Sequence, residues 1–96
     1  MLHEDGKFAW DEDKAALNAA KHGVTFAEAR EVFSDPHEVE FFDRNHSDEE
    51  ARFARVGFSG KRLLLVIFTM REGRMRIIHA RKASQTLAKM YAEENN

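Results

Sequence analysis

The stretch from Arg52 to Ala80, RFARVGFSGKRLLLVIFTMREGRMRIIHA, determines how this chain folds. It holds three runs rich in β-branched and aromatic residues, separated by two short turns that contain Gly60 and Gly73. The middle run is continuously apolar, which is typical of a central strand buried on both faces. Close turns between such runs predict a meander of antiparallel strands. We expect these strands at Arg52–Phe58, Arg62–Met70 and Arg74–Ala80.

The segments around this meander predict two more strands and three helices. Strands are expected at Lys7–Trp10 and His37–Phe42. Asp11 can cap a helix that runs to His22 and stops at Gly23. The pair Thr25 and Glu28 forms a capping box, which opens a second helix that ends before Pro36. Ala83–Glu94 is expected to be the final helix.

Residue spacing predicts which helix faces are buried. In the first helix, Ala16, Leu17 and Ala20 share one arc that we expect to face the core. Lys14, Asn18 and Lys21 form a second, polar stripe. The second helix is expected to bury Phe26, Ala29, Val32 and Phe33. The final helix is expected to bury Ala83, Leu87 and Met90, with Tyr91 at the edge of this stripe. The order of elements predicts a single α+β domain over residues 1–96, with helices packed on a sheet of about four antiparallel strands.

Composition excludes several classes of function. The 96 residues include no Cys, which excludes disulfides, thiolate metal sites and a cysteine nucleophile. The chain has no Gly-rich phosphate loop and no G-x-S-x-G motif. Its acidic N-terminus is unlike a signal peptide, and its longest apolar run, Leu63–Phe68, is too short to span a bilayer. We therefore expect a soluble cytoplasmic protein.

The net charge of −2 conceals an asymmetry between the two halves of the chain. Residues 1–50 hold 5 basic and 14 acidic side chains, whereas residues 51–96 hold 10 basic and 3 acidic ones. Such a split suggests a basic surface that meets nucleic acid or an acidic partner. The alternative is that the two halves neutralise each other in the fold.

Arginines cluster on the strands of the second half. Arg74, Arg76, Arg81 and Lys82 lie on or just after one strand, and Arg52 and Arg55 lie on its neighbour. Strand alternation places Arg74 and Arg76 on one face, and Arg81 on the other with His79. Guanidinium groups bind phosphate with two donors at once and stabilise charge on a transferring phosphoryl group. The alternative is a strand face that is charged because it meets solvent.

Two histidines and one carboxylate are the candidate acids and bases. His22 closes the first helix, where it is either a structural cap or a catalytic group. His79 follows the arginines of its strand, where it is either a base or a half-buried strand residue. Glu49 and Glu50 precede Arg52, so they belong to a solvated loop unless Glu50 pairs with Arg52 or acts as a base. We expect surface positions for His3, His37 and His46, and no metal site.

Several blocks of this sequence form a pattern from Phe8 to about Tyr91. The blocks are Phe8-Ala9-Trp10-Asp11, Lys14, Asn18, Lys21 to Ala29, Val32 to Pro36, Glu50-Ala51-Arg52, Gly57 and Arg76 to Ala83. In their order and spacing these blocks resemble the BrnT toxins of bacterial type II toxin–antitoxin pairs.

The resemblance implies a small RelE-like α+β fold, with two N-terminal helices and one C-terminal helix, and a ribonuclease that halts translation. It also implies a BrnA-like ribbon-helix-helix antitoxin, a heterotetramer with it, and operator DNA bound only through it. No cofactor and no membrane are implied. The sequence departs from the family pattern in two places, the end of the last strand and the last helix. The family usually has Ser at His79, and Arg and Glu in the last helix where this chain has Gln85, Thr86 and Leu87.

From these residues we hypothesise metal-independent RNA cleavage by attack of a 2′-hydroxyl on the adjacent phosphorus. Arg52, Arg76 and Arg81 would bind the phosphate, and His79 or His22 would be the base or acid, with Glu50 as a substitute. Further RNA contacts are expected from Lys14, Lys21, Arg55, Arg74 and Lys82. The competing hypothesis is a non-catalytic module that binds RNA or the antitoxin and serves operon autoregulation.

Overall fold

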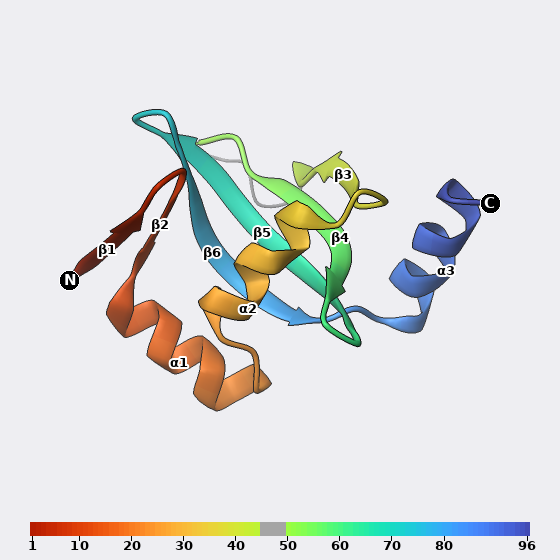
Figure 1. Ribbon diagram of the computed structural model, residues 1–96. Helices are drawn as coiled ribbons and strands as arrows, with labels where there is room; N and C mark the ends of the chain where they lie inside the picture. Colours follow the sequence, from red (N-terminus) through yellow and green to blue (C-terminus); the bar gives the residue numbers. More distant parts are fainter. Residues whose placement is uncertain (45–49) are drawn as a thin grey trace.

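A computed structural model describes residues 1–44 and 50–96. These residues form three α-helices, one 3-10 turn and a six-stranded sheet (Figure 1). The predicted loop residues Asn45 to Glu49, with His46 among them, lie outside the described residues. The elements are β1 (Leu2–Asp5), β2 (Phe8–Asp11), α1 (Glu12–His22), α2 (Phe26–Glu31), η1 (Val32–Ser34), β3 (Val39–Phe42), β4 (Phe53–Ser59), β5 (Arg62–Arg71), β6 (Arg74–Lys82) and α3 (Gln85–Glu94).

The predicted meander forms the middle of the sheet. The strand order is β1-β2-β6-β5-β4-β3, so β5 is central and pairs antiparallel with both β4 and β6. The prediction of about four antiparallel strands is wrong in two respects. β2 pairs parallel with β6, which makes the sheet mixed, and β1 adds a further strand at the edge. The sequence of β1, LHED, holds a single apolar residue and gave no strand pattern.

Helices cover the two faces of the sheet separately, with one apolar cluster on each side. Phe26 and Ala29 of α2 and Val32 of η1 pack in one cluster with Leu64 and Val66 of β5, as the sequence predicts. The opposite face carries a smaller cluster of Ala54, Val56 and Leu65, against which Leu87, Met90 and Tyr91 of α3 pack. In Figure 1, α2 lies in front of the sheet and α3 lies at the end away from β1.

The predicted faces of α1 are wrong. Leu17 is 71% exposed and Ala16 and Ala20 are also exposed, whereas Asn18 is buried. The Asn18 amide donates hydrogen bonds to the carbonyls of Val24 (2.9 Å) and Ala80 (2.8 Å), and its oxygen accepts one from the Ala80 amide (3.1 Å). β2 pairs with β6 only at Met75 and Arg76. The backbone N–H and C=O groups along the rest of that edge of β6 therefore need other hydrogen-bond partners. α1 supplies them through a polar side chain.

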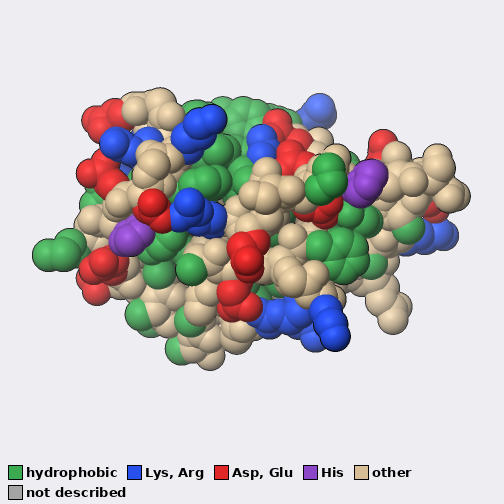
Figure 2. Space-filling view, in the orientation of Figure 1, with side chains coloured by type: hydrophobic (Ala, Val, Ile, Leu, Met, Phe, Trp, Pro, Cys, Tyr) green, Lys and Arg blue, Asp and Glu red, His purple; other side chains and the backbone are tan. Residues whose placement is uncertain are grey.

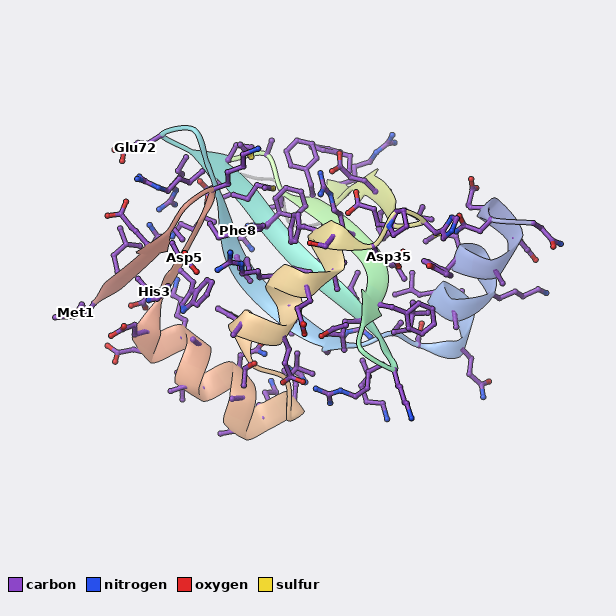
Figure 3. The ribbon with its side chains drawn as sticks, viewed as in Figure 1. Met1, His3, Asp5, Phe8, Asp35 and Glu72 are labelled. Carbon is purple, nitrogen blue, oxygen red and sulfur yellow. The ribbon has the colours of Figure 1, made fainter. Side chains whose placement is uncertain are left out.

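α3 is held to the rest of the chain by a cluster around Asp35. The Tyr91 hydroxyl and the Phe58 amide both donate to Asp35 Oδ2 at 2.8 Å, and the His37 amide donates to its other oxygen. Figure 3 shows Asp35 in the segment that follows α2, on the side of the C-terminal helix. Burial raises the pKa of Asp35, but the hydrogen bonds from Phe58, His37 and Tyr91 outweigh it and hold the pKa below its ordinary value. The carboxylate therefore stays ionised as an acceptor.

Candidate functional site

A cleft of about 650 Å³ lies on the sheet face that α3 covers only in part. All four strands from β3 to β6 contribute to it, together with the start of α3. Its polar lining includes Asp43, Arg52, His79 and Arg81. Its apolar lining includes Phe41, Leu65, Ile67, Ile78 and Leu87. The cleft therefore combines cationic side chains and a histidine with an apolar floor, and its volume is typical of sites that bind small organic groups.

A β-bulge in β6 brings His79 and Arg81 to this face. The partner of Phe68 is Ile77, but the partner of the preceding residue, Ile67, is His79, so one residue is inserted. Strand alternation alone would put Arg76 and Arg81 on opposite faces of the sheet. The residue inserted at the bulge puts them on the same face. Arg76, His79 and Arg81 pair with Thr69, Ile67 and Leu65 respectively. These alternate residues of β5 share one face, so the arginines and the histidine lie on it as well.

Arg52 reaches the cleft from the neighbouring strand. It directly precedes β4 and shares the side of Ala54, which also lines the cleft. Its carbonyl accepts a hydrogen bond from the Asp43 amide at 2.8 Å, which fixes the two chain segments at the cleft wall. The structure therefore brings Arg52, His79 and Arg81 together, although they are distant in sequence.

A second group of arginines continues the same face toward β1. Arg71, Arg74 and Arg76 line a hollow of about 390 Å³ beside Ala9. Arg74 is engaged, because it pairs with Glu4 at 2.6 Å and donates to the Gly6 carbonyl. Among residues 1–44 and 50–96, Arg76 makes no contact ion pair. Glu4 and Glu72 line the same hollow, so the charges of this group are largely balanced.

Glu50 lies between these two groups of arginines. Both of its oxygens accept hydrogen bonds from the Arg71 guanidinium, each at 3.0 Å. The hydrogen bond from Arg71 and the charges of Arg71, Arg52 and Arg76 hold the pKa of Glu50 below its ordinary value. A carboxylate of lowered pKa with both oxygens occupied is a poor general base near neutral pH.

Other predicted RNA-binding residues lie away from the cleft. Arg55 points to the opposite face, where it pairs with Glu38 and Glu40 and its guanidinium lies 4.5 Å from the centroid of the Phe33 ring. Lys14 and Lys21 are exposed on α1. Lys82 is exposed and pairs with Leu64, on the side of α2.

Ion pairs partly neutralise the charge asymmetry of the sequence. Basic side chains of the second half pair with acidic ones of the first half, as in Arg62 with Glu28 and Arg55 with Glu38. Figure 2 shows that acidic and basic side chains intermingle on the side of the molecule where α2 lies in front. The cleft lies on the opposite face, away from these two pairs.

Three residues at this site were not predicted from the sequence. Phe41 and Asp43 line the cleft, and Arg71 holds Glu50. Alternation along the predicted strand that ends at Phe42 already put Phe41 and Phe42 on opposite faces, so an aromatic side chain on each face was predictable. Arg71 follows the strand that the sequence predicts to end at Met70, whereas in the structure it is the last residue of β5.

Residues 10–86 match the family of the ribonuclease toxin BrnT of type II toxin–antitoxin systems. The chain belongs to the BrnT toxin family. The matched span of this BrnT protein includes Arg52, the bulge, His79 and Arg81. The chain matches no curated protein. Its family is one of ribonuclease toxins that act with a cognate antitoxin.

Two of the positions at which this chain departs from the resemblance line the cleft, His79 of β6 and Leu87 of α3. Gln85 and Thr86 are exposed at the start of the helix. In the described parts of the chain, no helix is long and apolar enough to cross a membrane.

Proposed function

We propose that this BrnT protein is a metal-independent endoribonuclease that cleaves RNA and inhibits translation until an antitoxin neutralises it. One observation carries the proposal. The bulge in β6 aligns His79 and Arg81 with Arg52 around one cleft. A phosphodiester needs cations around its oxygens and a proton-transfer group within reach, and this cleft offers both.

In the proposed reaction, His79 takes the proton from a 2′-hydroxyl, and that oxygen forms a bond to the adjacent phosphorus. The bond from phosphorus to the 5′-oxygen breaks, and the leaving oxygen receives a proton from an imidazolium or from water. The products are a 2′,3′-cyclic phosphate and a 5′-hydroxyl. Arg52 and Arg81 stabilise the charge that develops on the phosphoryl oxygens.

The remaining charged residues have supporting roles in this proposal. Glu50 positions Arg71 and is not the base, because its oxygens are occupied and its pKa is lowered. Arg76 and Arg71 extend the track for the RNA backbone toward β1. Arg55 stabilises the fold from the opposite face through Glu38 and Glu40.

The partner we propose is a BrnA-like ribbon-helix-helix antitoxin, in a heterotetramer that binds operator DNA through the antitoxin. Family membership supports the existence of an antitoxin. The RelE-like character of the fold is likewise a proposal, supported by helices on both faces of a sheet whose central strands are antiparallel.

Leu87 favours a second candidate function. Where the family pattern implies a charged side chain on α3, this chain places an apolar one at the cleft. A protein without that group would bind RNA or an antitoxin segment without breaking a bond, and would act in operon autoregulation.

Product analysis separates the two functions. Purified protein is incubated in EDTA with free RNA and, in parallel, with a translating extract, and the ends of any fragments are determined. The ribonuclease proposal predicts shortened RNA with cyclic phosphate ends. Intact RNA in both reactions, with RNA binding that weakens steeply with salt, would favour the binding module.

A further inference from the structure

We propose that Phe41 forms a base-stacking subsite for a nucleotide that flanks the scissile phosphate. The inference rests on the proposed function, because it assigns a specificity-determining residue to the same cleft. It also defines the substrate class as single-stranded RNA with an unpaired base next to the cleavage point.

The register of the sheet places Phe41 in line with His79. Phe41 pairs with Ala54, Ala54 pairs with Ile67, and Ile67 pairs with His79. The row crosses four strands, and Phe41, Ala54, Ile67 and His79 all line the cleft. Within this row Ala54 is fully buried, whereas Phe41, Ile67 and His79 are at least partly exposed.

The distance along this row separates the proposed stacking residue, Phe41, from the proposed proton-transfer residue, His79. Adjacent strands lie about 4.8 Å apart, so the backbones at Phe41 and His79 are about 14 Å apart. A nucleotide whose phosphate lies at His79 would therefore not place its own base on Phe41. A neighbouring nucleotide of an extended strand reaches that ring across Ile67, which is partly exposed between them.

The ring of Phe41 has a different environment from the ring of Phe42. Phe42 points to the opposite face, where its ring meets Phe53 with centroids 5.8 Å apart. Among the residues that the structure describes, Phe41 has no aromatic partner, and it is 37% exposed. Aromatic side chains that line a cationic groove stack unpaired bases, and the stack tolerates different bases because each has a π face.

Charge complementarity identifies the occupant as a nucleic acid strand. Arg52 and Arg81 lie in the same cleft as the ring, together with one carboxylate, Asp43, and Arg76 lies on the same face beyond it. A phosphate backbone on the arginines leaves its bases free to turn toward the apolar floor. A base within a duplex is stacked and paired already, so the subsite selects unpaired RNA.

The test measures binding of 2′-O-methyl oligonucleotides of A, U or C, which cannot be cleaved by 2′-hydroxyl attack. Variants Phe41→Leu and Phe41→Trp alter the proposed stack, and Phe42→Leu is the matched control on the same strand. We expect Phe41→Leu to weaken binding about tenfold or more, and Phe41→Trp to retain it. Phe42→Leu should change affinity by less than about twofold, because its ring lies on the other face.

Salt dependence distinguishes stacking from charge. The slope of log affinity against log salt should stay unchanged in Phe41→Leu and fall by about 0.7 in Arg52→Ala, which loses one phosphate contact. Equal affinity of wild type and Phe41→Leu, with binding still dependent on Arg52, would overturn the stacking subsite and leave the proposed function intact. Absence of RNA binding by the folded wild-type protein would overturn both.

Discussion

The imidazole rings of His22 and His79 meet edge to face, with their centroids 4.8 Å apart and their planes at 82°. His22 is the last residue of α1, and His79 lies in the bulge of β6. Two histidines that are 57 positions apart in the chain therefore form one pair. His79 lines the cleft and His22 is not part of its lining. In the proposed mechanism His79 is therefore the residue placed to reach RNA, and His22 packs against its ring from outside the cleft lining.

This arrangement predicts an order of effects for the two histidines. His79→Gln should lower RNA cleavage by about 10²-fold or more, because it removes the proposed proton-transfer group. His22→Gln should lower it by about tenfold or less, because the residue only packs against His79. Rates from single-turnover cleavage, with circular dichroism as the check on folding, provide the comparison. A larger loss in His22→Gln would transfer the catalytic role to that residue.

Glu50→Gln tests whether the carboxylate is a base or positions Arg71. An amide retains one acceptor for the guanidinium, so we expect less than about a tenfold loss of cleavage and an unchanged pH profile on the acidic side. Glu72→Gln, on the exposed turn after Arg71, is the control that removes a nearby charge. A loss as large as that of His79→Gln, with the acidic limb of the profile abolished, would identify Glu50 as the base.

Asn18→Ala should destabilise the protein by about 3 kcal/mol. The substitution removes three hydrogen bonds and leaves backbone groups of the fully buried Val24 and Ala80 without partners, at about 1 kcal/mol each. Leu17→Ala, one position away, should change stability by less than about 0.5 kcal/mol, because its side chain is exposed. Urea denaturation of both variants gives the two values. A larger loss of stability in Leu17→Ala than in Asn18→Ala would show that α1 buries the face predicted from the sequence.

The ionisation of Tyr91 can be read directly, since the chain contains one Tyr. Burial, and then the hydrogen bond to Asp35, raise the pKa of Tyr91 to about 12. An acid whose folded pKa lies above its unfolded value near 10 favours folding in its neutral form. The corresponding stability is complete below pH 10 and is lost as the pH rises toward about 12.

Ultraviolet absorbance of the phenolate should therefore show Tyr91 titrating near 12 in the wild type and closer to 10 in Asp35→Asn. In stability measurements, Tyr91→Phe should lack the loss above pH 10 that the wild type shows. An ordinary titration of the wild-type Tyr would mean that α3 is not held to Asp35 in solution.

Local sequence patterns predicted most of the elements. The Thr25–Glu28 capping box, the stop at Gly23 and the three strands of the meander are confirmed within one or two residues. These features depend on neighbouring residues alone. The side of α1 that packs inward depends on a free strand edge formed by residues 62 positions later, so spacing in an alanine-rich helix was misleading.

The candidate site was predicted in its residue types and missed in its geometry. Arginines and a histidine on adjacent strands pointed to phosphate chemistry, but alternation placed Arg76 and Arg81 on opposite faces. The insertion of one residue opposite β5 is a property of strand pairing, which a single strand does not encode. Strand alternation alone separates Arg52 from Arg55, but which of the two faces carries the cleft depends on where the helices pack, and a single strand does not encode that.

The central claim is that the cleft which the bulge creates is where RNA is cleaved. Arg81 and Lys82 are consecutive basic residues of β6 on opposite faces, so they form a matched pair. The decisive measurement is single-turnover RNA cleavage in EDTA by the wild type, Arg81→Ala and Lys82→Ala. We expect about a 10²-fold loss or more in Arg81→Ala and less than about a threefold loss in Lys82→Ala. Equal losses in both variants, with folding intact, would contradict the assignment of the cleft as the catalytic site.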